Sequence, residues 1–188
     1  MPNPVLDAIF SRRSIRAYSS QQVTEEQLKL ILKAGEAAPS AMNLQPWHFT
    51  AVQDQSLIRR INEAFRAQML LDCPPDTRVK FEEPAYSVFY HAPTVIFCSS
   101  PGIEAMRYTE TDTGMAIENM ALAAHALGLG SVILGMPRMA FMGPDGQDLR
   151  RLLQFPEGYD FLLALSVGVP EATKDAHPVE PGRVSIIW

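Results

Sequence analysis

The chain has 188 residues, of which 47% are hydrophobic and 20% charged, and its formal net charge is −5. This composition is that of an ordinary globular protein, which excludes global disorder and indicates one domain over residues 1–188. The acidic balance argues against general nucleic-acid binding, so any bound anion must be held by a local basic cluster. Two cysteines, Cys73 and Cys98, are too few for a disulfide framework or a metal site, and we expect Cys98 to be a buried free thiol.

The sequence shows no membrane segment. No apolar run approaches the roughly 18 residues that a spanning helix requires. The opening residues, Met1 to Pro4, lack the basic region followed by an apolar region that marks a signal peptide. We therefore expect a cytoplasmic protein with no membrane partner and no nucleic-acid partner.

The first part of the chain predicts two helices and a strand. Asn3 and Pro4 are typical of the cap and the first residue of a helix. Its apolar side, which we expect to be buried, consists of Val5, Leu6, Ile9 and Phe10. Thr24 and Gln27 form a capping-box pattern that begins a second helix, which Pro39 ends. A strand is expected over residues 47–53.

The middle of the chain alternates between helix and strand patterns. Helical spacing predicts a helix over residues 56–71. Residues 72–84 are rich in proline and charge, and we interpret them as a surface loop or a mobile lid. Residues 93–98 form a continuous apolar run, which is typical of a strand buried on both faces. The strongest helix pattern spans residues 113–127, and Gly128 follows it as a C-cap.

The last part predicts strands over residues 131–134 and 161–167, with a short helix over 144–153 between them. The tail, residues 171–188, ends in the apolar run Val184–Trp188, a strand without a partner in its own chain. A sheet edge of a second subunit would accept this strand. Because helices and strands alternate imperfectly, we expect a mixed sheet with helices on both faces.

A basic cluster follows the first helix. Arg12, Arg13 and Arg16 place three guanidinium groups around Ser14 within five residues. Arginine binds phosphate oxygens through paired hydrogen bonds. The cluster therefore indicates a phosphate site, and the alternative is a solvated turn with surface arginines.

A polar loop follows the second helix. Residues 39–47 (PSAMNLQPW) hold serine, asparagine and glutamine between prolines. Such a stiff set of donors and acceptors suits the edge of a planar heteroaromatic ring. The alternative is a capping loop whose polar groups bond their own backbone.

Several known motifs are excluded. The glycines of residues 128–135 follow a helix and precede a strand, the reverse of a Rossmann dinucleotide motif. The histidines show no metal-ligand spacing, and we find no nucleophile elbow and no phosphate-binding P-loop. Asp112 and Glu118 are six residues apart, on different faces of a helix, so we interpret each as a cap or surface residue. With no catalytic residue assigned, the sequence favours a cofactor that performs its own chemistry, and Gly135 would let a flat ligand approach the backbone.

Two segments resemble the FMN-dependent nitroreductase family: residues 8–16 (AIFSRRSIR) and residues 38–47 (APSAMNLQPW). The helix over 112–127, its glycine end and residues 167–170 (VGVP) lie in the family's order, so the resemblance spans nearly the whole chain. It implies an α+β fold, a three-layer α/β/α sandwich with a mixed central sheet. It also implies a homodimer in which the C-terminal strand is exchanged.

The resemblance further implies two FMN molecules at the dimer interface. Their ribityl and phosphate groups would be held by Arg12, Arg13, Ser14 and Arg16. The FMN bound mainly by the other subunit would be contacted by Pro39, Ser40, Ala41, Asn43 and Gln45. The backbone at Leu134 and Gly135 would face the N5 region of the flavin.

The chain departs from the family near its C-terminus. Similar proteins carry a lysine or arginine shortly before the final strand, where this chain has residues 177–181 (HPVEP). The nearby cations are Lys174 and Arg183. The phosphate would therefore rest on the N-terminal arginines alone, or on Lys174 as well.

These features lead to the hypothesis of an FMN-dependent NAD(P)H oxidoreductase that reduces small flat acceptors, such as nitroaromatics and quinones, by a ping-pong mechanism. A second hypothesis is a binding module that stores, delivers or senses FMN without turnover. The same fold includes flavin-destroying and dehalogenating enzymes, and a further alternative is an α/β protein without flavin.

Overall fold

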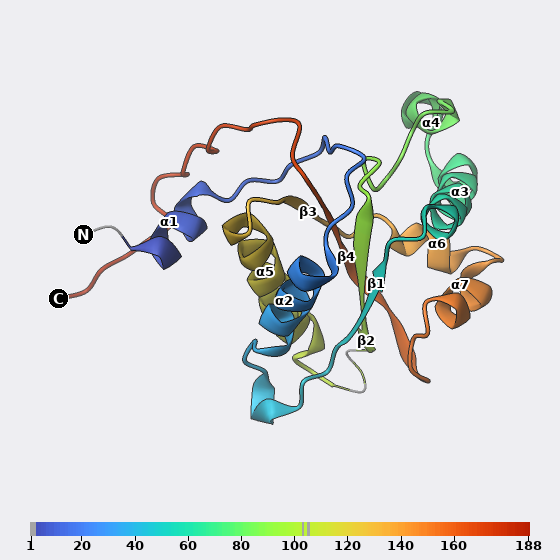
Figure 1. Cartoon of the computed structure of the whole chain (residues 1–188). Coiled ribbons are helices and arrows are strands. Elements are labelled where there is room, and N and C mark those ends of the chain that lie inside the picture. The colour runs from blue at the N-terminus through green and yellow to red at the C-terminus, as the bar shows by residue number, and fades with distance from the viewer. Residues whose placement is uncertain (1–2, 103, 105) are drawn as a thin grey trace.

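The computed structural model describes residues 3–102, 104 and 106–188 (Figure 1). Four strands form one sheet in the order β1-β2-β4-β3. These strands are β1 (His48–Val52), β2 (Thr94–Pro101), β3 (Gly130–Leu134) and β4 (Tyr159–Gly168). Helices cover both faces of the sheet, which confirms the predicted three-layer α/β/α sandwich.

Different helices cover the two faces of the sheet. One face is covered by α2 (Glu25–Glu36) and α5 (Thr109–Ala126). The other face is covered by α3 (Gln55–Asp72), α6 (Arg138–Met142) and α7 (Gly146–Leu152). Two short helices lie further out: α1 (Pro4–Ser11), beside α5, and α4 (Pro75–Glu82), beside α3.

Strand β2 supplies side chains to both cores. Val95 and Phe97 belong to the core under α3, and Ile96 and Cys98 belong to the core under α2 and α5. All four side chains are fully buried. Because successive side chains of a strand point to opposite faces, one continuous apolar run fills both layers. The predicted buried strand and the buried thiol are confirmed.

Neighbouring strands of the sheet are all antiparallel, whereas the sequence predicted a mixed sheet. Strands β2 and β3 run in the same direction and are connected through α5, but β4 lies between them. Insertion of this antiparallel strand removes the parallel pairing that the alternation of helix and strand suggested. Within the described residues, parallel pairing is limited to a bridge between Ser14 and Ser131.

The helix boundaries follow the predicted local signals. The Asn3 side chain accepts a hydrogen bond from the Val5 amide at 3.0 Å and begins α1. Thr24 and Gln27 cap each other's backbone at the start of α2, as a capping box does. Gly128 adopts a φ of 76° directly after α5, a left-handed conformation that glycine reaches without steric cost.

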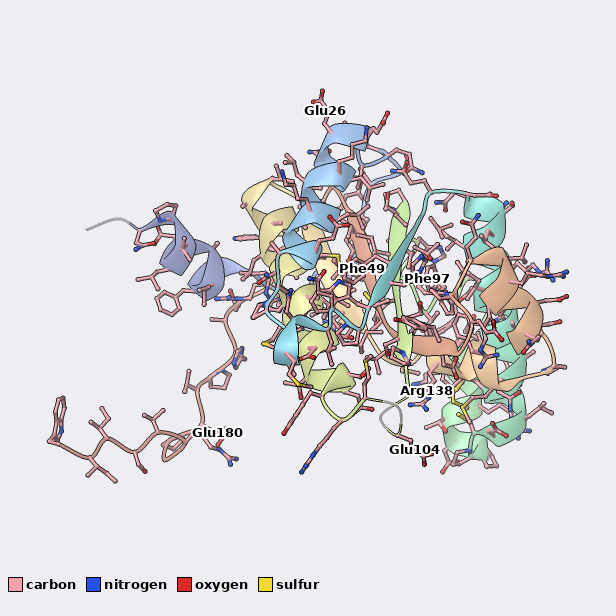
Figure 2. The ribbon with its side chains drawn as sticks, turned by 90° about the horizontal axis from the view of Figure 1, so that it is seen from below. Glu26, Phe49, Phe97, Glu104, Arg138 and Glu180 are labelled. Carbon is pink, nitrogen blue, oxygen red and sulfur yellow. The ribbon has the colours of Figure 1, made fainter. Side chains whose placement is uncertain are left out.

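Two expectations are not met within the single chain, and a third concerns a segment that we expect to pair with a second subunit. Pro75 begins α4 inside the predicted loop, because a helix needs no N–H at its first position and the fixed φ of proline suits a helix start. The apolar side of α1 is exposed, with Val5 at 65% and Phe10 at 68%, because α1 lies outside the sandwich. The tail bearing Val184–Trp188 forms no strand and extends away from the body, as Figure 2 shows around Glu180.

In the described part of the chain, no helix has both the length and the apolarity needed to cross a membrane.

Candidate functional site

The basic cluster of residues 12–16 lies along the outer edge of β3. The Ile15 amide donates a hydrogen bond to the Ser131 carbonyl at 2.9 Å, next to the bridge between Ser14 and Ser131. Gly130 allows this close approach, because a Cβ atom there would lie 3.0 Å from both Ile15 and Pro170. The sheet edge therefore fixes the position of the cluster.

Tyr18 supports the same segment from the inside. Its hydroxyl donates to the Ile15 carbonyl, and its ring is 8% exposed. Burial raises the pKa of the Tyr18 phenol, although the nearby Arg16 charge opposes this effect. The phenol therefore remains a protonated donor to the segment at neutral pH.

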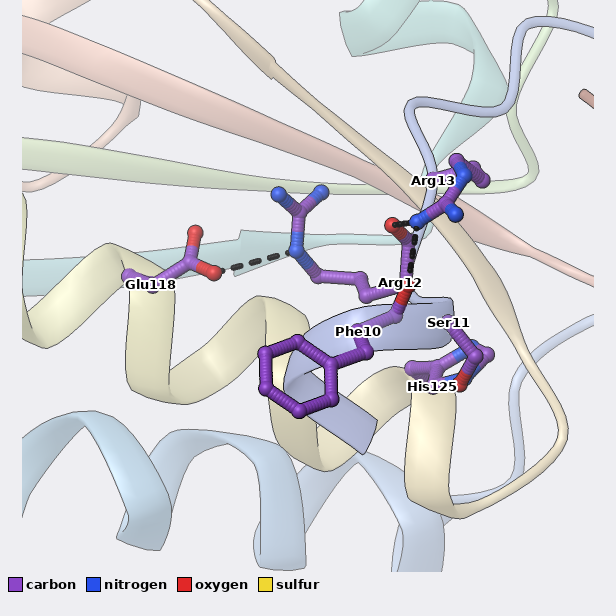
Figure 3. Close-up of polar contacts among 6 residues, drawn as sticks. All are labelled: Phe10, Ser11, Arg12, Arg13, Glu118 and His125. Atoms are coloured by element: carbon purple, nitrogen blue, oxygen red, sulfur yellow. Dashed lines mark hydrogen bonds and ion pairs between the residues drawn. The ribbon is translucent and has the colours of Figure 1, made fainter. Parts of the chain in front are cut away.

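Arg12 points along α5 and forms an ion pair with Glu118 (Figure 3). The Arg12 Nε donates to the Glu118 carboxylate at 3.0 Å, and the arginine side chain is 25% exposed. Among the described residues, its two terminal nitrogens have no hydrogen-bond acceptor. Glu118 thus orients the guanidinium and leaves its two terminal nitrogens available to an anion.

Arg13 has different partners. Its Nη1 donates to the Phe10 carbonyl at 2.8 Å and to the Arg12 carbonyl at 2.7 Å, at the end of α1 (Figure 3). Ser11 lies beside it and contacts His125 of α5, with 2.7 Å between Oγ and Nε2. These contacts attach the end of α1 to the body of the protein.

Two clefts adjoin the basic cluster. One has a volume of about 320 Å³ and the other about 390 Å³, and both are lined by Arg12, Arg13 and Lys174. Ser14 lines the second cleft. The tail thus brings Lys174 to Arg12 and Arg13, whereas neither Arg16 nor Arg183 lines either cleft.

Leu134 and Gly135 lie at the far end of β3 from Ser14 and its partner Ser131. Gly135 follows Ser131 by four positions, an extended span of roughly 13 Å. Gly135 is exposed, and among the described residues a Cβ atom there would meet Leu163 alone, at 3.9 Å. The backbone at this end of β3 is therefore open to a ligand, at a distance from the basic cluster.

The polar loop contains the 3-10 turn η1 (Ala41–Asn43) and a strained backbone. Met42, Asn43 and Gln45 have φ values of 52°, 55° and 48°, in the left-handed region. The Ser40 hydroxyl accepts from the Gln45 amide at 2.9 Å, and Gln45 Nε2 donates to Asn43 Oδ1 at 3.0 Å. Strain held by such contacts is typical of functional loops.

Asp112 connects this loop to α5. Its carboxylate is 3% exposed and accepts from the Ala41 amide at 3.1 Å. The loop lies at the beginning of α5, whereas His125, near the end of that helix, contacts Ser11 (Figure 1). One chain therefore keeps residues 39–45 apart from residues 12–16.

The sequence predicts Asp112 and Glu118 as cap or surface residues and does not indicate the contacts that they make in the fold. Asp112 holds the polar loop, and Glu118 holds Arg12. Their partners lie 71 and 106 positions away, so no local pattern could indicate them. No group of three or more potential metal ligands occurs in the residues that the structure describes.

The chain is similar to known proteins over most of its length. Residues 9–169 match the sequence model of the Nitroreductase family. A protein of Archaeoglobus fulgidus with the provisional name NADH dehydrogenase/NAD(P)H nitroreductase is 35% identical over 178 residues, covering 93% of this chain and 90% of its own. An iodotyrosine deiodinase of Thermotoga neapolitana is 26% identical over 92% of this chain and 91% of its own.

A solved structure agrees over the full length. The crystal structure of a nitroreductase with bound FMN from Bacteroides fragilis superposes with a TM-score of 0.92, at 30% identity and with all of both chains covered. Fold and sequence thus place the protein in the class of nitroreductase folds. The chain belongs to the nitroreductase family.

Proposed function

We propose that this protein is an FMN-dependent NAD(P)H oxidoreductase. The strongest support is the position of Arg12 and Lys174 in shared clefts beside β3, in a chain that matches an FMN-bound nitroreductase along its whole length. The name of the Archaeoglobus relative supports NADH or NADPH as the electron donor.

The residues present fit a flavin phosphate. Arg12 offers two uncommitted terminal nitrogens, Lys174 adds a second cation, and Ser14 adds a hydroxyl. A phosphate monoester carries nearly two negative charges, which two cations can balance. Arg13, which lines both clefts, and Arg16, which lines neither but follows Ser14 by two residues, complete the proposed basic site.

When bound, FMN would supply the redox chemistry, accepting hydride from NAD(P)H and passing electrons to a second substrate. The protein's residues bind and orient it. Glu118 would hold Arg12 for the phosphate, and the backbone at Leu134 and at the exposed Gly135 would face the ring. The loop residues proposed to contact the flavin of the partner subunit are Pro39, Ser40, Ala41, Asn43 and Gln45.

A homodimer would complete this site. The apolar side of α1 and the apolar end of the tail, where Ile187 is 96% exposed, are surfaces that a second copy would cover. Strand β1 is an edge strand, whereas the edge at β3 is already bridged by Ser14. We therefore assign β1 of the partner subunit as the acceptor of Val184–Trp188.

Small, flat, electron-poor molecules such as nitroaromatics and quinones are the proposed acceptors. A cleft of about 210 Å³ lies between the polar loop and the start of α5, with Met42, Leu44 and Tyr108 in its lining. Such apolar and aromatic walls suit a planar ring. If donor and acceptor occupy the same site in turn, the kinetics are ping-pong.

Steady-state kinetics test the proposal. NADPH is varied at several fixed concentrations of a quinone and of a nitroaromatic, with the FMN-loaded protein. Parallel double-reciprocal lines are expected. Intersecting lines would contradict alternate use of one site, and absence of turnover with bound flavin would favour a storage or sensing protein instead.

A different flavin reaction on this fold is the second candidate function. The deiodinase of Thermotoga neapolitana, similar over most of the chain, favours this alternative. Release of iodide from a halogenated phenol, at a rate above quinone reduction, would support it.

A further inference from the structure

Tyr90 and His91 have an unusual backbone conformation. Both residues have a φ of 56°, so two consecutive non-glycine residues lie in the left-handed region. This conformation costs free energy and persists only where the surroundings enforce it. Its position, directly before β2 and outside the polar loop, calls for a physical explanation.

The surroundings do enforce it. The Asn62 side chain of α3 donates to the Tyr86 carbonyl at 3.0 Å and accepts from the Val88 amide at 2.9 Å. The Ser87 carbonyl accepts from the Tyr90 amide at 3.1 Å, and the Ser87 hydroxyl accepts from the His91 amide at 3.3 Å. The loop before β2 is thus held at several points.

The strained loop places the Tyr90 ring under Arg16. The Arg16 Cζ lies 5.6 Å from the centre of the ring, within the range of a cation–π interaction. The other contact of this guanidinium is a long one, from Nη1 to the Ser14 carbonyl at 3.4 Å. No carboxylate pairs with Arg16 in the part of the chain that the structure describes.

Arg12 and Arg16 are therefore oriented by different means. Glu118 orients Arg12 and neutralises part of its charge. The Tyr90 ring orients Arg16 without contributing an opposite formal charge, so the full positive charge remains for an anionic ligand.

We propose that Tyr90 is a positioning residue for Arg16, and that the strained backbone at Tyr90 and His91 serves to place its ring. The proposal rests on the proposed function, in which Arg16 holds the ribityl and phosphate part of FMN. Tyr90 acts through Arg16 and does not contact FMN itself.

A double-mutant cycle on FMN affinity tests this role. The apoprotein is titrated with FMN, and quenching of flavin fluorescence gives Kd for the wild type, Tyr90→Leu, Arg16→Ala and the double variant. Tyr90→Leu is expected to weaken FMN binding about three- to tenfold in the wild-type background. In the Arg16→Ala background the same change is expected to alter Kd by less than about twofold.

Two further variants separate positioning from folding. Tyr90→Phe retains the ring and is expected to bind FMN like the wild type. Tyr90→Asn removes the ring but suits the left-handed backbone, so it replaces Tyr90→Leu in the cycle if the leucine variant fails to fold.

The possible results distinguish failure of the positioning role of Tyr90 from failure of the proposed FMN site. An equal loss of affinity in both backgrounds, or no loss in either, would overturn the positioning role while leaving the FMN site intact. Wild-type protein that binds no FMN would overturn the proposed function together with this inference.

Discussion

Three arginines that look equivalent in the sequence have three different environments. Arg12 pairs with a carboxylate, Arg13 donates to the carbonyls at the end of α1, and Arg16 lies over an aromatic ring. The sequence predicts the cluster, because its members are neighbours. It cannot predict their environments, because Glu118 and Tyr90 are distant in the chain and only the fold brings them close.

Arg12→Ala tests the phosphate assignment at this scale. Loss of a charge-assisted contact is expected to cost about 1.5–3 kcal/mol, which corresponds to roughly ten- to hundredfold weaker FMN binding. Titration of the apoprotein with FMN measures the change, and Arg59→Ala, an exposed arginine on α3, is the matched control. Equal affinities of the two variants would show that Arg12 does not hold the phosphate.

Lys174 provides a second comparison. Lys174→Ala is expected to weaken FMN binding about three- to tenfold, a modest effect because the side chain is exposed. Arg183→Ala serves as the control, since Arg183 lines neither cleft beside the arginines. The same titration with FMN measures both variants. A larger loss of affinity for Arg183→Ala than for Lys174→Ala would assign the phosphate contact to Arg183 instead.

At the scale of elements, local signals determined most helix ends and strands, and packing determined the rest. Strand β2 was predictable because its apolar run serves two cores. The helix α4 was not predictable, because proline at position 75 is equally typical of a loop and of the first residue of a helix. The sequence could not predict the separation of the polar loop from the basic cluster either, because this separation depends on the course of α5 through the fold.

The cap of α3 leads to a prediction on pH. Hydrogen bonds from the Ser56 side chain and amide, the largest effects, lower the pKa of Asp54 below its usual 3.8. The charged cap therefore stabilises the fold above the pKa of the unfolded chain, and this contribution is lost as pH falls through the lower, folded pKa. Asp54→Asn keeps a capping side chain but cannot titrate.

We expect the wild type to lose more unfolding free energy than Asp54→Asn between pH 5 and pH 2, values chosen about the usual aspartate pKa of roughly 3.9. Urea unfolding monitored by circular dichroism at a series of pH values measures the difference. Parallel pH profiles for the two proteins would show that the cap charge contributes nothing to folding.

At the scale of the whole molecule, two apolar surfaces, one on α1 and one on the tail, remain exposed in a single copy. The exposed side of α1 departs from the predicted buried stripe, and the exposed tail is the segment predicted to pair with a second subunit. A sequence pattern indicates that a surface is apolar but not which chain covers it. In the proposed homodimer, a second copy would cover both surfaces.

Deletion of residues 184–188 tests this explanation without removing Lys174. If the tail pairs with β1 of the partner subunit, the shortened chain is expected to form a weaker dimer or a monomer and to retain less FMN. Sedimentation equilibrium and the flavin-to-protein absorbance ratio measure both effects. A truncated protein with an unchanged dimer would show that the tail is not exchanged.

The proposal that this protein is an NAD(P)H oxidoreductase is tested most directly by anaerobic mixing of the FMN-loaded protein with NADPH or NADH. The visible absorbance of the flavin follows the reaction. We predict rapid bleaching, and recovery of the absorbance when a quinone is added. Bound flavin whose absorbance is unchanged by either nucleotide would contradict the assignment of this protein as an oxidoreductase.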